Sequence, residues 1–166
     1  MNADKVLQAQ EPDGAPIHCP TNPPYRILVV DDDVSIRQLN TETLIRFGYV
    51  ANAAEDGAAA WDALSADSYD LLITDHNMPK VSGVELLEKL RAARMALPVI
   101  MATGALPEQE FSQQPWLQPA ATLLKPYTTE EMLGTVREVL RATDDARGPI
   151  SQPDCERQPS ADGLLV

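Results

Sequence analysis

A stretch of nine residues, from Leu71 to Pro79, constrains the fold more than any other part of the chain. The run Leu-Leu-Ile-Thr leads directly into Asp75, and Asn77 and Pro79 follow closely. A short apolar run of this kind is typical of a strand that is buried on both faces of a parallel sheet. The asparagine and the proline predict the turn at which the strand ends. We therefore expect Asp75 at the carboxyl end of a buried strand, where open α/β sheets bind their ligands.

Four other segments are predicted strands, namely residues 27–30, 49–53, 98–103 and 123–124. Residues 27–30 lead into Asp31-Asp32-Asp33, residues 98–103 end at Thr103, and residues 123–124 lead into Lys125. Between the strands, apolar residues recur at helical spacing. This alternation predicts an α/β fold. The natural choice is a flavodoxin-like, doubly wound, five-stranded parallel sheet of order 2-1-3-4-5, with helices on both faces.

Two of the predicted helices begin with a capping box, in which a hydroxyl residue precedes a glutamate by three positions. Ser82 and Glu85 form this pattern after the third strand, and Thr128 and Glu131 form it before the last helix. Both helices therefore have a clear predicted first turn.

The length of 166 residues suits one domain of ordinary size. We predict this domain at residues 25–142. Residues 1–24 and 143–166 are rich in proline and polar residues and carry no helical or strand period, so we predict a disordered arm and a disordered tail.

Composition narrows the choice of partners and compartment. The net charge of −12 disfavours nucleic acid and anionic membranes as partners. The two cysteines, Cys19 and Cys155, both lie in the predicted arm and tail, so no disulfide framework is expected. No stretch has the length of a membrane span or the pattern of a signal peptide. We therefore predict a cytoplasmic protein.

The predicted sheet order brings the carboxyl ends of the first and third strands together, and with them Asp31, Asp32 and Asp75. Three neighbouring carboxylates raise one another's pKa unless a cation lies between them. Mg²⁺ commonly binds through one or two carboxylates and keeps several waters, so we predict a Mg²⁺ site here. Asn77 could add its backbone carbonyl. The alternative is a solvated loop whose acids cap the following helix, a role that we expect of Asp33 in either case.

Thr103 and Lys125 end two further strands at the same edge of the sheet. Taken singly, they suggest a β-branched strand residue and a surface lysine. Taken together with the acids, they place a hydroxyl, an ammonium and a cation around one carboxylate, which suits a tetrahedral anion such as a phosphoryl group. Asp75 could then attack phosphorus and form an acyl phosphate.

In these residues the chain resembles the receiver domains of two-component response regulators. The resemblance covers residues 26–142. It rests on the Asp31-Asp32 pair, on Asp75 followed by Asn77-Met78-Pro79 and Gly83, on Thr103, and on Lys125-Pro126.

The resemblance implies a signalling protein and not an enzyme in the usual sense. Asp75 would accept a phosphoryl group from a histidine kinase or a histidine phosphotransfer protein, and Thr103 and Lys125 would bind the phosphoryl oxygens. Mg²⁺ would be held by Asp31, Asp32, Asp75 and the Asn77 carbonyl, and the Lys125-Pro126 peptide would be cis. Only a short tail follows the last predicted helix, so we expect no output domain. The protein would act by docking to a downstream partner or by passing the phosphoryl group on.

Two features depart from the receiver pattern. Receivers usually carry Tyr or Phe three residues before the lysine, where this chain has Thr122. The fourth helix would occupy residues 107–119, but Pro115 and Pro119 interrupt it. We therefore expect the phosphoryl chemistry of receivers without their usual aromatic switch.

Three smaller features remain open. Trp116 and Leu117 are either an anchor for a partner or packing over the interrupted helix. His76 stands beside the predicted acceptor but has no second metal ligand nearby in sequence, so we favour no catalytic or metal role for it. Ala105 is small and would leave the site open to water.

The main alternative is a phosphohydrolase of the haloacid-dehalogenase type, with Asp31 as nucleophile and Asp33 as acid. That class needs a further acid pair after a strand, and the only candidate, Asp144-Asp145, follows a predicted helix. It also leaves Asp75 unexplained. A second alternative is a receiver that has lost its chemistry and serves only for binding, which the complete set of reactive residues disfavours.

Overall fold

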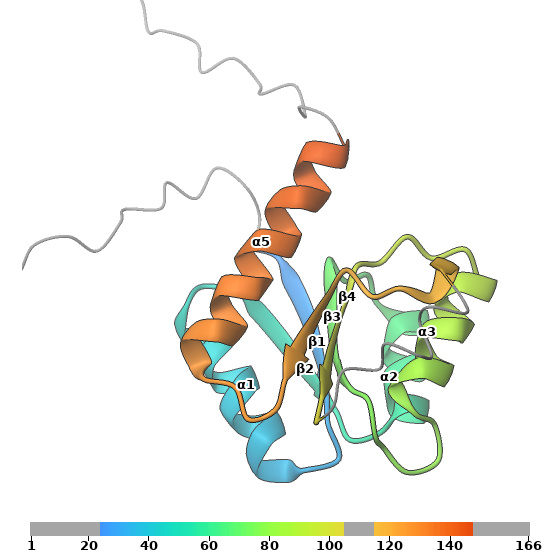
Figure 1. The fold of residues 1–166 in the computed structure, drawn as a ribbon, viewed down its shortest axis with the longest axis horizontal. Coiled ribbons are helices and arrows are strands. Elements are labelled where there is room, and N and C mark those ends of the chain that lie inside the picture. Colours follow the sequence, from blue (N-terminus) through green and yellow to red (C-terminus); the bar gives the residue numbers. More distant parts are fainter. Residues whose placement is uncertain (1–23, 105–114, 148–166) are drawn as a thin grey trace, which may run out of the picture.

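The computed structural model describes residues 24–104 and 115–147. Within them, five parallel strands form one sheet in the order β2-β1-β3-β4-β5, which confirms the predicted order (Figure 1). The strands are β1 (Arg26–Val30), β2 (Val50–Ala54), β3 (Leu71–Asp75), β4 (Val99–Thr103) and β5 (Ala121–Leu124).

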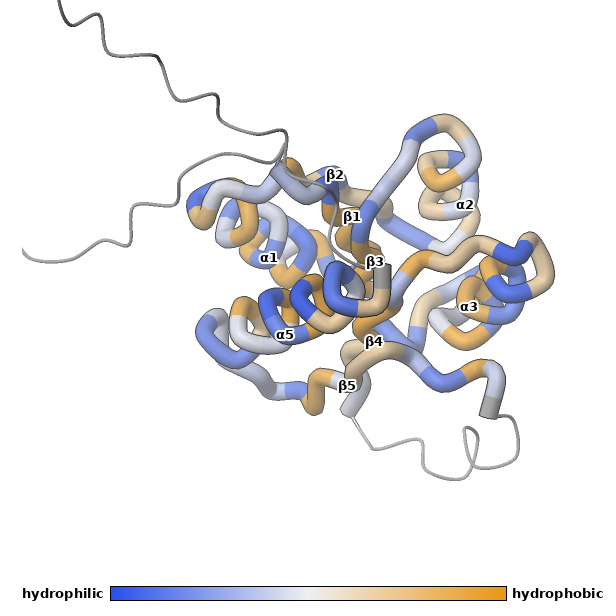
Figure 2. Tube along the Cα trace, turned by 90° about the horizontal axis from the view of Figure 1, so that it is seen from above, coloured by the Kyte–Doolittle hydropathy of each residue, from blue (hydrophilic) through white to orange (hydrophobic). Residues whose placement is uncertain are grey.

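The helices lie on both faces of this sheet, as predicted. Figure 2 shows α1 and α5 on one face, and α2 and α3 on the other. Their bounds are α1 (Val34–Arg46), α2 (Gly57–Ala66), α3 (Gly83–Ala92) and α5 (Thr129–Arg147), with a short 3-10 helix η1 (Pro115–Leu117) before β5.

Each face of the sheet carries its own apolar core. Alternate residues of β1 enter opposite cores, since Leu28 and Val30 pack with α2 and α3 whereas Ile27 and Val29 pack with α1 and α5. Side chains of a strand point alternately to the two faces, so a strand between two helical layers must be apolar throughout. This explains why β1, β3 and β4 are continuous apolar runs.

The predicted helix starts are confirmed. Ser82 and Glu85 form a complete capping box at α3. At α5, the Glu131 amide donates to the Thr128 hydroxyl, and the Glu131 carboxylate accepts from the Thr128 amide. These reciprocal bonds satisfy amide groups that a helix start leaves unpaired.

The end of α5 differs from the prediction. The tail was predicted from residue 143, but the helix continues to Arg147. The Tyr25 hydroxyl, at the start of the domain, donates to the Asp144 carboxylate. A tertiary contact therefore stabilises a turn whose polar composition predicts disorder. The remainder of the predicted arm and tail lies outside the described residues.

The segment around η1 separates two neighbouring side chains. Leu117 is buried in the core beside α2 and α3, whereas Trp116 is 67% exposed. The packing interpretation therefore holds for Leu117. Ala105 and the first part of the expected fourth helix lie outside the described residues.

Helix α1 leaves some of its regularly spaced apolar residues exposed. Leu44 is fully buried, but Leu39 and Phe47, which share its helical spacing, are more than half exposed. Asn40 is buried instead and donates to the Tyr127 hydroxyl at 2.9 Å. A polar contact with the segment before α5 thus helps to hold the face that the helix buries.

No helix within residues 24–104 and 115–147 is both long enough and apolar enough to cross a membrane.

Candidate functional site

Strand register brings the predicted acids together. Val30 lies opposite Thr74 in the pairing of β1 with β3, so the next residues, Asp31 and Asp75, lie side by side at the carboxyl ends of the two strands. One ligand oxygen from each of Asp31, Asp32 and Asp75 lies within 4.8 Å of the others. Asp31 and Asp75 are buried and Asp32 is exposed, so the cluster opens to solvent on one side.

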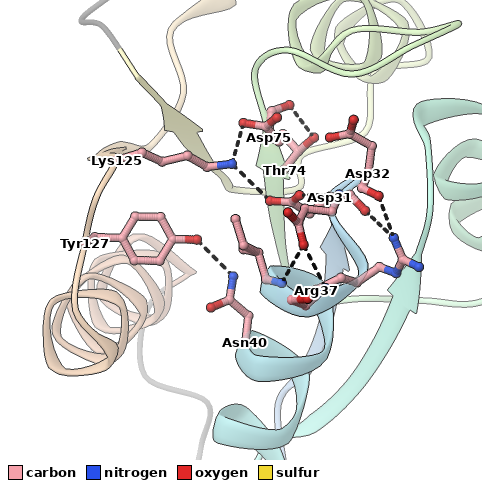
Figure 3. A network of polar contacts seen from close by, with 11 residues as sticks. Asp31, Asp32, Arg37, Asn40, Thr74, Asp75, Lys125 and Tyr127 are labelled. Carbon is pink, nitrogen blue, oxygen red and sulfur yellow. Dashed lines mark hydrogen bonds and ion pairs between the residues drawn. The ribbon is translucent and has the colours of Figure 1, made fainter.

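Lys125 joins this cluster from the end of β5. Its Nζ lies 3.1 Å from Asp31 Oδ2 and 3.0 Å from Asp75 Oδ1, so one ammonium bridges the two buried carboxylates (Figure 3). The Lys125 amide donates to the Thr103 carbonyl at 2.8 Å, which fixes the lysine to the end of β4. The predicted convergence of lysine and acids is therefore confirmed.

Burial and charge shift the pKa values of this pair. Burial raises the pKa of Asp31, although the amide of Asp33 and the ammonium of Lys125 both act to lower it. Burial acts to lower the pKa of Lys125, but its hydrogen bonds to Asp75 and Asp31 outweigh this effect and leave the pKa raised. The ionised form of Asp31 is thus costly in this site, and a bound cation would relieve that cost.

The loop of acids after β1 is held by contacts that the sequence analysis missed. The Asp33 amide donates to Asp31 Oδ1 at 2.9 Å. Arg37 Nη1 donates to the Asp31 carbonyl at 2.6 Å and approaches the Asp32 carbonyl at 3.5 Å (Figure 3). An arginine one turn into α1 is the signal that could have indicated this contact, since its side chain can reach back to the loop.

The loop after β3 begins with a close backbone approach. A Cβ built on Gly83 would lie 2.3 Å from the Asp75 carbonyl oxygen, and the Gly83 amide donates to the His76 carbonyl at 3.1 Å. Only glycine fits at this point. The residue matters because its approach fixes the backbone that carries the predicted acceptor.

The other predicted site residues lie at the same edge. Thr103 is buried and follows Ala102, which pairs with Asp75 in the register of β3 and β4. Asn77 is exposed in the loop after β3. The His76 ring lies against buried Met101, with Nδ1 3.4 Å from its Sδ, and His76 does not belong to the acid cluster.

The segment after Lys125 carries two further features. The Lys125-Pro126 peptide is cis, as the resemblance implies. The Tyr127 hydroxyl, bound to Asn40, points toward α1 below Lys125 (Figure 3). The residue three positions before Lys125 is Thr122, which is half-buried in β5. It provides no aromatic ring at this position.

The residues of the dehalogenase alternative do not assemble. Asp33 caps α1, with its Oδ1 accepting from the Ser35 amide at 2.8 Å and the Ile36 amide at 3.2 Å. Asp144 and Asp145 lie in the last turns of α5, where Asp144 accepts a hydrogen bond from Tyr25, the residue before β1. The acid pair that this class requires is therefore not at the cluster.

The donor set of the cluster suits a hard divalent cation. Carboxylate oxygens are preferred ligands of Mg²⁺, which also keeps several waters and so needs an open side. The cluster offers three carboxylates, and exposed Asp32 forms its open side. The residues present thus fit the predicted metal.

Comparison with known proteins identifies the class. The family model described as the response regulator receiver domain matches residues 27–137. The chain therefore belongs to the family of response regulator receiver domains, which are signalling proteins and not classical enzymes.

Individual relatives agree with this assignment. Response regulator MprA of Mycobacterium sp. (strain KMS) is 35% identical over 130 residues, which are 77% of this chain and 56% of MprA. MprA of Mycolicibacterium vanbaalenii is 36% identical over 129 residues, which are 75% of this chain and 55% of that protein. The chain thus spans about half the length of the curated relatives it matches.

Solved structures match over nearly their whole length. Chemotaxis response regulator CheY4 of Vibrio cholerae aligns with a TM-score of 0.64 and 30% identity, covering 70% of this chain and 98% of CheY4. Response regulator TrrA of Thermotoga maritima, solved in complex with Mg²⁺-BeF, aligns with a TM-score of 0.61 and 30% identity, covering 69% of this chain and 98% of TrrA.

Proposed function

We propose that Asp75 is a phosphoryl acceptor of a two-component system or phosphorelay in the cytoplasm. It would take the phosphoryl group from a histidine kinase or a histidine phosphotransfer protein in a Mg²⁺-dependent reaction. Phosphorylated Asp75 would control docking to a downstream partner or pass the group onward. The single observation that carries the proposal is the Lys125 ammonium bridging Asp31 and Asp75 within a cluster of three carboxylates.

In the forward reaction, an Asp75 oxygen attacks phosphorus and the bond from phosphorus to the donor histidine nitrogen breaks. Negative charge develops on the transferring phosphoryl oxygens. The Lys125 ammonium and the Thr103 hydroxyl are the donors that would bind these oxygens. Attack of water on the same phosphorus later releases phosphate and restores the Asp75 carboxylate.

Asp31, Asp32, Asp75 and the Asn77 carbonyl are the groups that would hold Mg²⁺. The ion, when bound, supplies positive charge that neutralises the carboxylates and the phosphoryl oxygens. The raised pKa of Asp31, caused by burial, supports this role, because a carboxylate that is costly to ionise gains most from a cation. The relative TrrA, solved with Mg²⁺-BeF, gives independent support.

The surface beside the acids supports a protein donor. Val34, the first residue of α1 and the third after Asp31, is 54% exposed, and Leu39 is 58% exposed on the same helix. Exposed apolar side chains next to a reactive carboxylate suit a donor that docks as a folded protein better than a small phosphate ester.

The test is adduct formation with beryllofluoride or acetyl phosphate in the presence of Mg²⁺, measured by mass spectrometry and fluorine NMR. Wild-type protein is expected to form one adduct, and Asp75→Ala is expected to abolish it. Asp33→Asn is the matched control, since asparagine retains the helix cap and the acid lies outside the cluster. It should form the adduct normally.

Two results would contradict the proposal. Multiple turnover of phosphate esters that is lost in Asp31→Ala and Asp33→Asn but kept in Asp75→Ala would favour the dehalogenase alternative. Folded wild-type protein that takes a phosphoryl group from no donor would favour a binding module.

A further inference from the structure

The loop between β3 and α3, residues 76–82, is fastened to helix α2 by an ion pair. Lys80 Nζ lies 2.5 Å from Asp56 Oδ2. The Lys80 side chain is 67% exposed, whereas the Asp56 carboxylate is only 6% exposed. The lysine therefore reaches from the loop to a fixed and enclosed partner, which distinguishes this contact from an ordinary surface pair between two mobile side chains.

Asp56 is fixed because it has a second role. It is the N-cap of α2, and its Oδ1 accepts from the Ala58 amide at 3.0 Å and the Ala59 amide at 2.8 Å. Its other oxygen is left for Lys80. One carboxylate thus starts a helix and holds the loop that follows the acceptor strand. In keeping with this, the hydrogen bond from Lys80 lowers the pKa of Asp56, and the same bond raises the pKa of Lys80.

The backbone at Lys80 is also unusual. Its φ is 68°, in the left-handed region where glycine or asparagine is preferred. A lysine in this conformation is less stable than glycine unless its side chain makes a stabilising contact. The bond to Asp56 is that contribution.

A second contact joins the same two elements. A Cβ on Gly57, the first residue of α2, would lie 2.7 Å from both the Cβ and the carbonyl oxygen of Val81. The first turn of α2 therefore packs directly on the loop. Met78, near the loop's start, is buried with Ala60 and Leu64 of α2. The loop is held to α2 on both sides of Lys80 and by the ion pair at Lys80 itself.

We propose that Lys80 and Asp56 are positioning residues for the metal site. By fastening the loop to α2, they preset the backbone around Asn77, so that its carbonyl is in place before Mg²⁺ arrives. This inference rests on the proposed function, because it concerns the same metal site. Neither residue belongs to the acid cluster, so both act through the loop backbone.

A preset ligand changes metal affinity and leaves the later chemistry alone. Without the ion pair, the loop must be ordered when the ion binds, and this cost weakens Mg²⁺ binding. Once Mg²⁺ is saturating, Asp75, Thr103 and Lys125 should be arranged as before. We therefore expect a higher dissociation constant for Mg²⁺ together with an unchanged rate of phosphorylation at saturating Mg²⁺.

The experiment is Mg²⁺ titration by calorimetry, followed by phosphorylation from acetyl phosphate at varied Mg²⁺. Lys80→Met is expected to raise the dissociation constant for Mg²⁺ about 10-fold, as loss of a supporting residue around a metal site typically does. Asp56→Asn retains the helix cap and should give the same result. The double variant should bind Mg²⁺ with the same dissociation constant as either single variant. Lys80→Arg, which keeps a cation at this position, should retain most of the wild-type affinity.

Lys89→Met is the matched control, because Lys89 is an exposed lysine on α3 without a partner in the acid cluster. It should bind Mg²⁺ like the wild type. An unchanged dissociation constant in Lys80→Met, additive losses in the double variant, or a lower rate at saturating Mg²⁺ would each overturn the inference. These outcomes leave the proposed function standing, whereas wild-type protein that binds no Mg²⁺ would overturn both. Thermal unfolding of every variant shows that each is folded.

Discussion

At the scale of single residues, Gly83 illustrates how closely the backbone around Asp75 is packed. Its α-carbon lies so near the Asp75 carbonyl that any side chain would displace one of the two. A displacement here moves Asp75 relative to Asp31 and Lys125. The Lys125 ammonium lies within hydrogen-bonding distance of both carboxylates. A substitution at Gly83 should therefore reduce both the folding stability and the phosphorylation of Asp75.

The substitution Gly83→Ala is expected to lower the free energy of unfolding by about 1–3 kcal/mol, the usual cost of forcing extra volume into a packed site. It should also reduce phosphorylation of Asp75 at saturating Mg²⁺. Urea denaturation and acetyl phosphate labelling measure the two effects.

Gly134→Ala is the matched control. Gly134 lies within α5, and a Cβ there would meet nothing within 4 Å. Alanine favours a helix interior over glycine, so this variant should gain up to about 1 kcal/mol of stability and label normally. A destabilised Gly134→Ala, or an unaffected Gly83→Ala, would contradict the packing described here.

At the scale of elements, α5 extends beyond the end that its sequence predicts, and a contact with Tyr25 stabilises the added turn. The hydrogen bond from Tyr25 to Asp144 raises the pKa of Tyr25 to about 12, with burial and the charge of Asp144 adding to the effect. Since this pKa lies above the ordinary value of 10.0, the protonated form is favoured in the folded state. The resulting stability is fully present below pH 10.0 and is lost as the pH rises toward about 12.

Asp144→Asn should return the pKa of Tyr25 toward 10.0, since a neutral amide oxygen is a weaker hydrogen-bond acceptor than a carboxylate and carries no negative charge. The phenolate absorbance of Tyr25, isolated by subtracting the titration of a Tyr25→Phe variant, measures the shift. Asp145→Asn, on an exposed neighbour in the same turn, should leave it unchanged. Equal shifts in both variants would show that the overall negative charge of this turn, and not the contact with Asp144, sets the pKa of Tyr25.

The elements also show what the sequence could and could not predict. Strand positions and order followed from apolar runs, because a strand covered on both faces tolerates few polar residues. The convergence of Asp31, Asp75 and Lys125 then followed from the sheet order alone. These predictions depend on backbone pairing, which has few solutions.

Contacts between one side chain and a distant element were not predictable. Leu39 and Phe47 fit the helical period of α1 yet are exposed, because the Asn40–Tyr127 bond helps to set the face that the helix buries. The Lys80–Asp56 pair and the extended end of α5 depend likewise on tertiary partners that no local pattern encodes. Periodicity fixes the type of an element more strongly than its orientation or its last turn.

At the scale of the whole molecule, the metal site should couple phosphoryl chemistry to folding stability. A ligand that binds only the folded state raises the free energy of unfolding by an amount set by its concentration relative to its dissociation constant. Burial disfavours the ionised form of Asp31 only in the folded state. A cation that binds the cluster should therefore stabilise the folded state.

Mg²⁺ at about 100 times its dissociation constant is therefore expected to raise the free energy of unfolding by about 2.7 kcal/mol. Thermal unfolding with and without Mg²⁺, at matched ionic strength in KCl, measures this effect. Asp75→Asn and Asp31→Asn should each remove most of it. Equal stabilisation by KCl alone, or an undiminished effect in both variants, would mean that the ion does not bind at the cluster.

The bond between Tyr25 and Asp144 has a further consequence for how this domain could be connected to another polypeptide. It brings the first strand's beginning and the last helix's end together, at the amino edge of the sheet, while Asp75 lies at the carboxyl edge (Figure 1). A strand of five residues separates the two edges by about 17 Å. A domain whose entry and exit points are adjacent can be inserted into a surface loop of another protein with little distortion. A fluorescent reporter attached at either point would leave the acceptor edge uncovered.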